Sequence, residues 1–224
     1  MTVTPPRRVG RPRKDEAGDT RALLLAAALD LFVEHGYAAT SVRMIARAAG
    51  LSDGGLYAHF ANKDAIYREL TAQAGVGAVD TVIAELLPDP DTPPDDPRGF
   101  LTETVDRILD IFDTDESRKF TKLLLRQAIP NDPRLVTDML GKGAAALAPY
   151  FPIWADRGQL TEVVTARLRT GESTGEALMW ELLAPLGFVR LVYLHGPSAA
   201  RAEGRRRAHD HLAFFLAAVV RDRR

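Results

Sequence analysis

Apolar side chains recur every three or four residues along most of this 224-residue chain, and no stretch alternates with period two for long enough to predict a strand. The chain is therefore predicted to be all-α. Helices are expected over residues 20–35, 62–87, 131–154, 175–194 and 199–221, with further helical spacing between 100 and 127. An acidic, proline-rich segment over 88–99 predicts a loop, and the form of residues 161–174 stays open.

Residues 40–70 predict two short helices joined by a tight turn and followed by a third helix. The first is indicated by apolar residues at i, i+3, i+4 and i+7, namely Val42, Ile45, Ala46 and Ala49. Gly50 supplies the positive φ that ends a helix, and Ser52 is suited to cap the next one, whose Leu56 and Phe60 face inward. This pattern matches a helix-turn-helix, whose second helix, here about residues 52–59, enters the major groove of DNA.

The motif also resembles a known family. Three runs carry the resemblance to the TetR family of bacterial regulators: Gly50-Leu51-Ser52, Leu56-Tyr57-Ala58-His59-Phe60 and Asn62-Lys63-Asp64. It is tight over about residues 20–70, and beyond them only helical architecture and length agree. The resemblance implies a three-helix DNA-binding domain and a larger C-terminal helical domain for ligand binding and dimerisation. The expected parts are a disordered basic arm (1–18), the DNA-binding domain (19–66) and the C-terminal domain (67–224).

Composition narrows the class of protein. At 46% hydrophobic residues the chain is globular, and the absence of cysteine excludes disulfide scaffolds, thiolate catalysis and cysteine-ligated metal sites. Residues 1–70 hold ten Lys/Arg against eight Asp/Glu and the remainder nineteen against twenty-two, which is weak support for a nucleic-acid partner. No segment resembles a signal peptide, and Arg190 interrupts the apolar run over 182–194, so a cytoplasmic protein without a membrane partner or cofactor is expected.

Candidate DNA contacts follow from the placement of the side chains. Arg43, in the first turn of the helix before the glycine turn, can give two hydrogen bonds to guanine O6 and N7. Ser41 and Lys63 are expected to hold phosphates from either side. Gly54 and Gly55 leave the recognition helix almost bare, which favours close approach to DNA; loose helix packing is the alternative.

The family resemblance adds further contacts to the predicted set, which also includes Ser52. It implies that Tyr57 and His59 contact phosphates and so position the helix without reading sequence. Asp53 departs from the family pattern, which commonly has Lys or Arg there and Thr or Ser at Gly55. Asp53 can accept from a cytosine amino group or stabilise the helix N-terminus, and the second interpretation is favoured.

The basic arm over residues 7–14 resembles the Gly-Arg-Pro core of AT-hook peptides. Disordered arms of this kind lie in the narrow minor groove of A·T-rich DNA, which makes Arg11 and Arg13 candidate contacts. A solvated tail is an equal alternative.

Two sets of apolar residues are assigned to the C-terminal domain. The resemblance implies a ligand cavity, for which the candidates are Phe112, Phe120, Met139, Tyr150, Trp154, Met179 and Trp180, although aromatics at helical spacing are more often ordinary core. It also implies that the last two helices pair with their twins in a four-helix bundle through Leu182, Leu186, Val189, Tyr193, Leu212, Phe215, Leu216 and Val219. Packing within one chain is the alternative for part of this set.

The sequence thus predicts a homodimeric repressor that leaves a palindromic operator when a small, unidentified effector binds the C-terminal domain. The fourth helix is the expected lever, with Gly75-Val76-Gly77 as its hinge or as a break in the helix. A helical enzyme is a poor rival, because the histidines show no metal spacing and neither a nucleophile elbow nor a phosphate loop occurs. A DNA-binding module whose C-terminal half serves only dimerisation or a protein partner is a stronger rival, and activation stays open.

Overall fold

The computed structural model describes residues 14–72, 82, 85–86, 92–128 and 134–222. The chain divides into two compact units, Met1–Tyr67 and Arg68–Arg224. Throughout the described ranges the regular structure is helical, apart from one isolated antiparallel bridge between Leu160 and Val220. The all-α prediction is confirmed.

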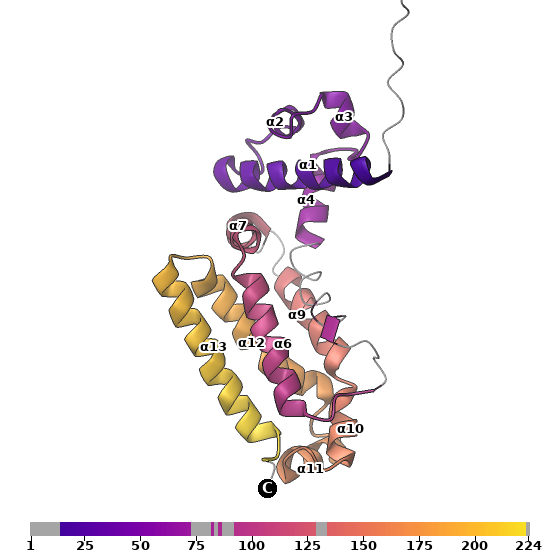
Figure 1. The fold of residues 1–224 in the computed structure, drawn as a ribbon, viewed down its shortest axis with the longest axis vertical. Coiled ribbons are helices and arrows are strands. Elements are labelled where there is room, and N and C mark those ends of the chain that lie inside the picture. The colour runs from indigo at the N-terminus through magenta and orange to yellow at the C-terminus, as the bar shows by residue number, and fades with distance from the viewer. Residues whose placement is uncertain (1–13, 73–81, 83–84, 87–91, 129–133, 223–224) are drawn as a thin grey trace, which may run out of the picture. The chain divides into compact units, whose positions relative to one another are not determined.

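Unit 1 packs short helices across one long helix. Its helices are α1 (Lys14–His35), α2 (Val42–Ala48), α3 (Asp53–Tyr57) and the first part of α4 (Lys63–Ala72). Figure 1 shows α2 and α3 lying beside each other over α1. The buried core consists of Leu24, Leu25, Ala28, Leu29, Phe32, Ile45, Ala46, Leu56, Phe60 and Ile66. This apolar seam holds the exposed side of α2 and α3 in a fixed shape.

Helix α1 begins earlier than the sequence analysis expected. Residues 14–18 were assigned to the basic arm, but the helix starts at Lys14. The reason is local: Lys14, Glu16 and Ala17 are good helix formers, and the acidic Asp15 and Glu16 favour the first turn of a helix electrostatically. The arm is therefore shorter than predicted, and its residues 1–13 lie outside the described part.

Unit 2 is a larger helical bundle. Its elements are α6 (Pro97–Phe112), α7 (Asp115–Leu123) continuing as the π-helix η2 (Leu124–Ala128), α9 (Arg134–Leu147), α10 (Tyr150–Asp156), α11 (Glu162–Thr170), α12 (Gly175–Val189) continuing as the π-helix η3 (Arg190–Leu194), and α13 (Ser198–Val219). Helix α12 packs against both α9 and α13, and α13 packs against α6 (Figure 1). Their shared core is built around side chains such as Leu101, Leu109, Trp154, Met179 and Leu182.

Prolines explain two departures from the predicted elements of unit 2. The helix expected over 131–154 is broken into α9 and α10 at the turn over 148–149, because Pro149 has no N–H to continue α9 and precedes the first residue of α10 instead. The loop expected over 88–99 ends early, since Pro97 opens α6, where a missing N–H costs nothing. Residues 161–174, left open, contain α11.

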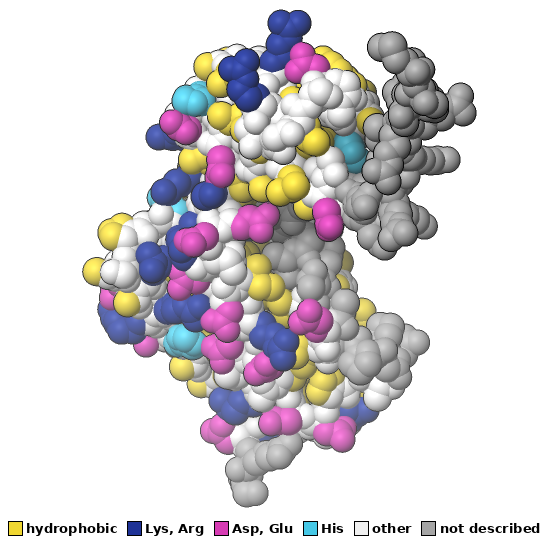
Figure 2. Space-filling model, turned by 45° about the horizontal axis from the view of Figure 1, so that its top comes forward, with side chains coloured by type: hydrophobic (Ala, Val, Ile, Leu, Met, Phe, Trp, Pro, Cys, Tyr) yellow, Lys and Arg dark blue, Asp and Glu magenta, His cyan; other side chains and the backbone are white. Residues whose placement is uncertain are grey.

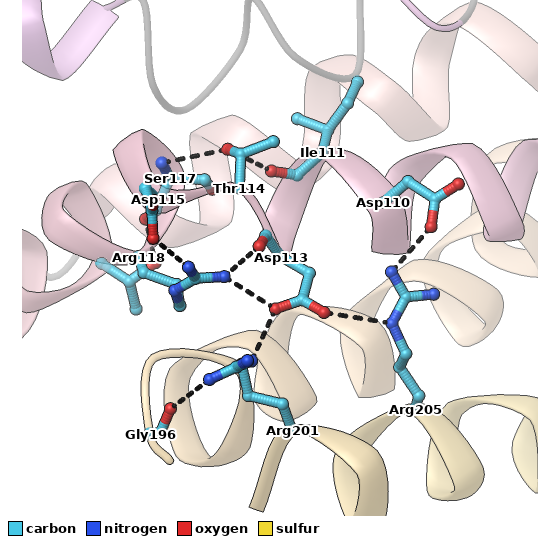
Figure 3. Close-up of polar contacts among 11 residues, drawn as sticks. Asp110, Ile111, Asp113, Thr114, Asp115, Ser117, Arg118, Gly196, Arg201 and Arg205 are labelled. Carbon is cyan, nitrogen blue, oxygen red and sulfur yellow. Dashed lines mark hydrogen bonds and ion pairs between the residues drawn. The ribbon is translucent and has the colours of Figure 1, made fainter. Parts of the chain in front are cut away.

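A network of ion pairs joins the end of α6 to the start of α13. The Asp113 carboxylate lies 2.9 Å from both Arg118 Nη1 and Arg201 Nε, and 3.4 Å from Arg205 Nε (Figure 3). Arg205 Nη2 also lies 2.7 Å from Asp110 Oδ1. The single carboxylate of Asp113 therefore connects three arginines from α7 and α13, and it fixes the α6–α7 corner on α13.

Helix 175–194 is long and apolar enough to cross a membrane, judged by length and composition alone. Of its most apolar stretch, 44% is buried inside the structure. Several of its side chains, among them Met179, Leu182 and Leu186, belong to the core of unit 2. Arg190 in the same helix is also buried. Buried side chains of this kind are typical of the core helix of a helical bundle.

Candidate nucleic-acid interface

The turn between α2 and α3 has the local geometry that the sequence predicts. The Ser41 side chain caps α2 by accepting from Met44 N at 3.2 Å, and Ser52 caps α3 by accepting from Gly55 N at 3.2 Å. Gly50 has φ +72°, and the N–H of Leu51 donates to the carbonyl of Ala46 at 2.8 Å. Ser41, Gly50 and Ser52 thus set the angle between α2 and α3.

The outer surface of α3 is almost free of bulky side chains at its start. Gly54 is exposed and Gly55 is half-buried. An added Cβ would come no closer than 3.9 Å to Ser52 Oγ at Gly54 and 3.5 Å at Gly55. Both are ordinary contacts, so internal packing does not require glycine at either position. What the glycines provide is a bare outer surface.

Tyr57 is the last residue of α3, and His59 lies in the turn that follows. The Tyr57 side chain is 57% exposed, whereas His59 is only half-buried at the turn that follows. Arg21 of α1 donates from Nη1 to the His59 carbonyl at 2.8 Å, and its guanidinium stacks on the Phe60 ring at 4.3 Å. Arg21 therefore anchors the C-terminal end of α3 on α1. The phosphate contacts of Tyr57 and His59 stay a prediction.

An ion pair that sequence reasoning missed bridges α2 and α3. Arg43 Nε lies 3.2 Å from Asp53 Oδ2, with the side chains 86% and 49% exposed. Figure 2 shows basic side chains next to an acidic one at the end of unit 1 that α2 and α3 form. Arg43 and Asp53 border an open depression of about 480 Å³, together with Arg47 and the turn residues Gly50 to Ser52. The pair is ten residues apart in sequence, and only the angle of the turn brings it together.

Lys63 is bound within unit 1. Its Nζ donates to the carbonyls of Tyr37 at 2.6 Å and Thr40 at 2.7 Å, and it lies 4.2 Å from the centre of the Tyr37 ring. Two of its three N–H donors therefore hold the connection between α1 and α2 in the free protein. The predicted phosphate contact is left to the third N–H.

Tyr37 supports the same corner from the other side. Its ring packs edge-on against Tyr67, with the centroids 5.0 Å apart, and its hydroxyl donates to the Asp64 carboxylate. Burial, together with this hydrogen bond and the nearby Asp64 charge, raises the pKa of Tyr37 to about 12. The hydroxyl therefore stays protonated and donating at any physiological pH.

Changing Lys63 to methionine is expected to loosen unit 1. Two carbonyls lose a charged donor, which lowers local stability by about 1–3 kcal/mol. We expect faster hydrogen–deuterium exchange of backbone amides in α1 and α2. The matched control is Lys122→Met, because Lys122 is an exposed lysine of unit 2. Unchanged exchange at α1 and α2 would show that the contacts of Lys63 add nothing to stability.

Several predicted residues lie outside the described part of the chain. These are Arg11 and Arg13 of the arm, the hinge Gly75-Val76-Gly77 and the side chain of Met139.

The predicted ligand residues lie in two groups in unit 2. Phe112, Phe120, Tyr150, Trp154 and Met179 are buried, whereas Trp180 is half-buried. Tyr150 and Trp154 pack against each other with ring centroids 5.7 Å apart, and Trp154 Nε1 donates to the Pro94 carbonyl at 2.9 Å. These two belong to the core of unit 2, and their contact with a ligand stays a prediction. Phe112 and Phe120 instead flank a buried charge.

That charge is Arg190, which sequence reasoning noted only as an interruption of an apolar run. Its Nε donates to Thr121 Oγ1 at 3.1 Å, and its guanidinium lies 4.4 Å from the centre of the Phe112 ring. Burial lowers the pKa of Arg190 to about 10, so the group stays charged near neutral pH. Arg190 also opens the π-helix η3, and π-helical turns occur often at functional sites.

The residues predicted to form the dimer interface lie mostly inside unit 2. Seven of the eight, all except the half-buried Tyr193, are buried within the chain's own core: Leu182, Leu186, Val189, Leu212, Phe215, Leu216 and Val219. They pack inside one protomer because α12 and α13 contact each other along this side. Their pairing with a second protomer stays a prediction. The large apolar side chains that these helices leave exposed are others: Phe188 at 62%, Val192 at 46% and Phe214 at 76%.

In the described part of the chain, no three His, Asp or Glu side chains gather in a way that could hold a metal ion.

Comparisons with known proteins agree with the geometry of unit 1. Residues 24–70 match the family model described as bacterial regulatory proteins, tetR family. The transcriptional regulator AcrR of Shigella flexneri is 31% identical over 113 residues, which cover 50% of each chain. The repressor KstR2 of Rhodococcus jostii is 43% identical over 70 residues, covering 30% of this chain and 32% of KstR2. The alignments thus span about half the length of the first relative and a third of the second.

Solved structures extend the likeness of the fold to both units. A TetR-family regulator from Mesorhizobium loti superposes with a TM-score of 0.63 at 20% identity, covering 92% of this chain and 98% of that one. The triclosan complex of SmeT, the repressor of a multidrug efflux pump in Stenotrophomonas maltophilia, gives a TM-score of 0.62 at 25% identity, covering 91% and 93%. The helical architecture of unit 2 is therefore shared along with the helix-turn-helix.

Proposed function

From the premise that this chain belongs to the TetR family of bacterial regulatory proteins, we propose that it is a repressor that binds a palindromic DNA operator as a homodimer and leaves it when a small molecule binds unit 2. The observation that carries the proposal is the capped α2–Gly50–α3 hairpin with a bare α3 and an exposed Arg43. Such a hairpin places its second helix in the major groove. Regulation of transcription in the cytoplasm follows from this role.

Dimerisation is supported by the apolar surface of the last helices. Phe188 and Val192 are four residues apart along the α12–η3 helix, and Phe214 is exposed on the adjoining α13. Large apolar side chains left exposed on two adjoining helices favour a protein interface. A two-fold pairing through this surface would present two recognition helices, and they must lie about 34–36 Å apart to enter successive major grooves.

Release by an effector is supported by the interior of unit 2 and by the relatives. SmeT is described in complex with triclosan, and the proposed effector here is likewise a small apolar or amphipathic molecule. The buried Arg190, flanked by Phe112 and Phe120, is a candidate polar group for orienting it. The effector would act by favouring a dimer whose recognition helices have the wrong separation, to the extent that it prefers that shape.

A second version of the function is favoured by one observation. Tyr150, Trp154 and Met179 are packed into the core, as expected if unit 2 serves dimerisation without an effector. Thermal-shift screening of small molecules, followed by gel shifts with each hit, separates the two versions. Hits that raise the melting temperature and release DNA support the repressor with an effector, and their absence supports the second version.

The DNA-binding proposal is tested by selecting a duplex from random DNA and measuring gel shifts at several salt concentrations. We expect Arg43→Ala to relax the preference at one base per half-site, at a cost of about 1–3 kcal/mol, because it removes a two-bond contact to a base. The matched control is Arg167→Ala, since Arg167 is an exposed arginine of α11. A monomeric protein with no salt-dependent retention on any duplex would refute the proposal.

A further inference from the structure

We propose that Asp53 is a positioning residue for Arg43: the carboxylate holds the guanidinium in the orientation that reads one guanine in each half-site. The inference rests on the proposed function and adds a specificity determinant to it. Its basis is the ion pair of 3.2 Å between Arg43 Nε and Asp53 Oδ2 at the exposed edge where α2 meets α3.

The ion pair with Asp53 leaves one edge of the Arg43 guanidinium available for hydrogen bonds to a base. A guanidinium has five N–H donors in a planar fork, and the contact with Asp53 is made through Nε. The terminal nitrogens Nη1 and Nη2 each keep one N–H on the edge of the guanidinium that faces away from Nε. Those two parallel donors match O6 and N7 of guanine in the major groove.

The pair also reduces the entropy that Arg43 loses on binding. With 86% of its side chain exposed, Arg43 would otherwise sample many rotamers, and an arginine carries about 2 kcal/mol of rotamer entropy. The backbone of Asp53 is fixed, because it is the first residue of α3 and follows the Ser52 cap. A carboxylate on a short side chain, attached to a fixed backbone, therefore orients a longer and more flexible cation before DNA arrives, which is preorganisation.

A positioning role of Asp53 can be distinguished from two simpler roles of its negative charge. A carboxylate at a DNA-facing edge repels phosphates, so Asp53 weakens binding to every duplex alike. Stabilisation of α3 by an acidic first residue would act equally on all sequences as well. Only the positioning of Arg43 makes Asp53 matter for one base and not for others.

The experiment compares four duplexes that differ at the base whose preference Arg43→Ala abolishes. For Asp53→Ala and Asp53→Asn we expect the ratio of guanine over non-guanine affinity to fall about tenfold, while affinity for the non-guanine duplexes is equal or higher. Asp53→Glu, which keeps the carboxylate, should recover part of the ratio. In the double variant with Arg43→Ala the ratio should fall no further than with Arg43→Ala alone.

Glu34→Gln is the matched control, because it removes one exposed acidic charge from α1 of the same unit. The inference is overturned if Asp53→Ala changes affinity for the four duplexes by one common factor, with the guanine preference intact. Circular dichroism melts verify that each variant is folded. If the wild-type chain binds no selected duplex, the proposed function fails first and the inference with it, an outcome distinct from retained binding with unchanged preference.

Discussion

Alanine at Gly54 or Gly55 is expected to stabilise unit 1 and to weaken its binding to DNA. A helical glycine costs about 0.5–1 kcal/mol relative to alanine, and a Cβ at either position meets only ordinary contacts in the structure. Each change should therefore raise the free energy of unfolding by about that amount. We expect urea denaturation followed by circular dichroism to measure the gain.

The same methyl group should weaken binding because it stands between α3 and the groove. Holding the helix away from DNA lengthens several hydrogen bonds together, and each good base contact is worth about 1–3 kcal/mol, so affinity should fall about tenfold or more. Gel shifts on the same preparations measure this loss. A substitution that improves folding and harms function shows the stability–function trade-off expected of a surface kept bare for a partner.

The control for this pair of effects is Gly141→Ala in α9 of unit 2. No described atom lies within 4 Å of a Cβ built at Gly141, so the substitution should stabilise the chain without changing its affinity for DNA. If Gly54→Ala and Gly55→Ala also leave affinity unchanged, the bare surface of α3 is not used for close approach. The alternative of loose helix packing would then hold.

The hairpin could be predicted from sequence because its signals are local. A serine three residues before the N–H that it caps and a glycine at a left-handed turn act within one turn of helix, so Gly50 and Ser52 were assigned correctly. Leu56 and Phe60 followed from the helical period alone. No knowledge of distant residues was needed for any of them.

Long-range contacts were outside the reach of the same reasoning. Lys63 was assigned to a phosphate because it begins a helix, yet its ammonium bonds to carbonyls more than twenty residues earlier in the chain. Asp53 was read as a helix-terminal charge, and its pairing with Arg43 depends on the interhelical angle. Side-chain partners are set by the tertiary fold, which propensities do not encode.

The surface of α12 could not be predicted because the helix is apolar on nearly every side. Periodicity identifies a buried face only when the opposite face is polar, and here Leu182 and Phe188 carry the same hydrophobic signal. In the structure Leu182 is buried while Phe188 is exposed. Which apolar face packs inside the protomer was decided by α9 and α13, the two helices against which α12 lies.

The core of unit 2 depends on a close approach of backbone to backbone at Gly175, the first residue of α12. A Cβ there would overlap the carbonyl oxygen of Ala148, in the turn between α9 and α10, and would lie 2.8 Å from its carbonyl carbon. Backbone atoms cannot rotate away as a side chain does. The α9–α10 turn or the start of α12 would have to move, and with it the packing of Tyr150 and Trp154.

Gly175→Ala is therefore expected to lower the free energy of unfolding by about 1–3 kcal/mol, the range for overpacking a tight interior. Gly141→Ala makes the same chemical change in the same unit, where space is open, and should raise that free energy by about 0.5–1 kcal/mol. The two urea midpoints should move in opposite directions. If both rise, α12 tolerates a side chain at its first residue, and the close contact with Ala148 does not constrain the bundle.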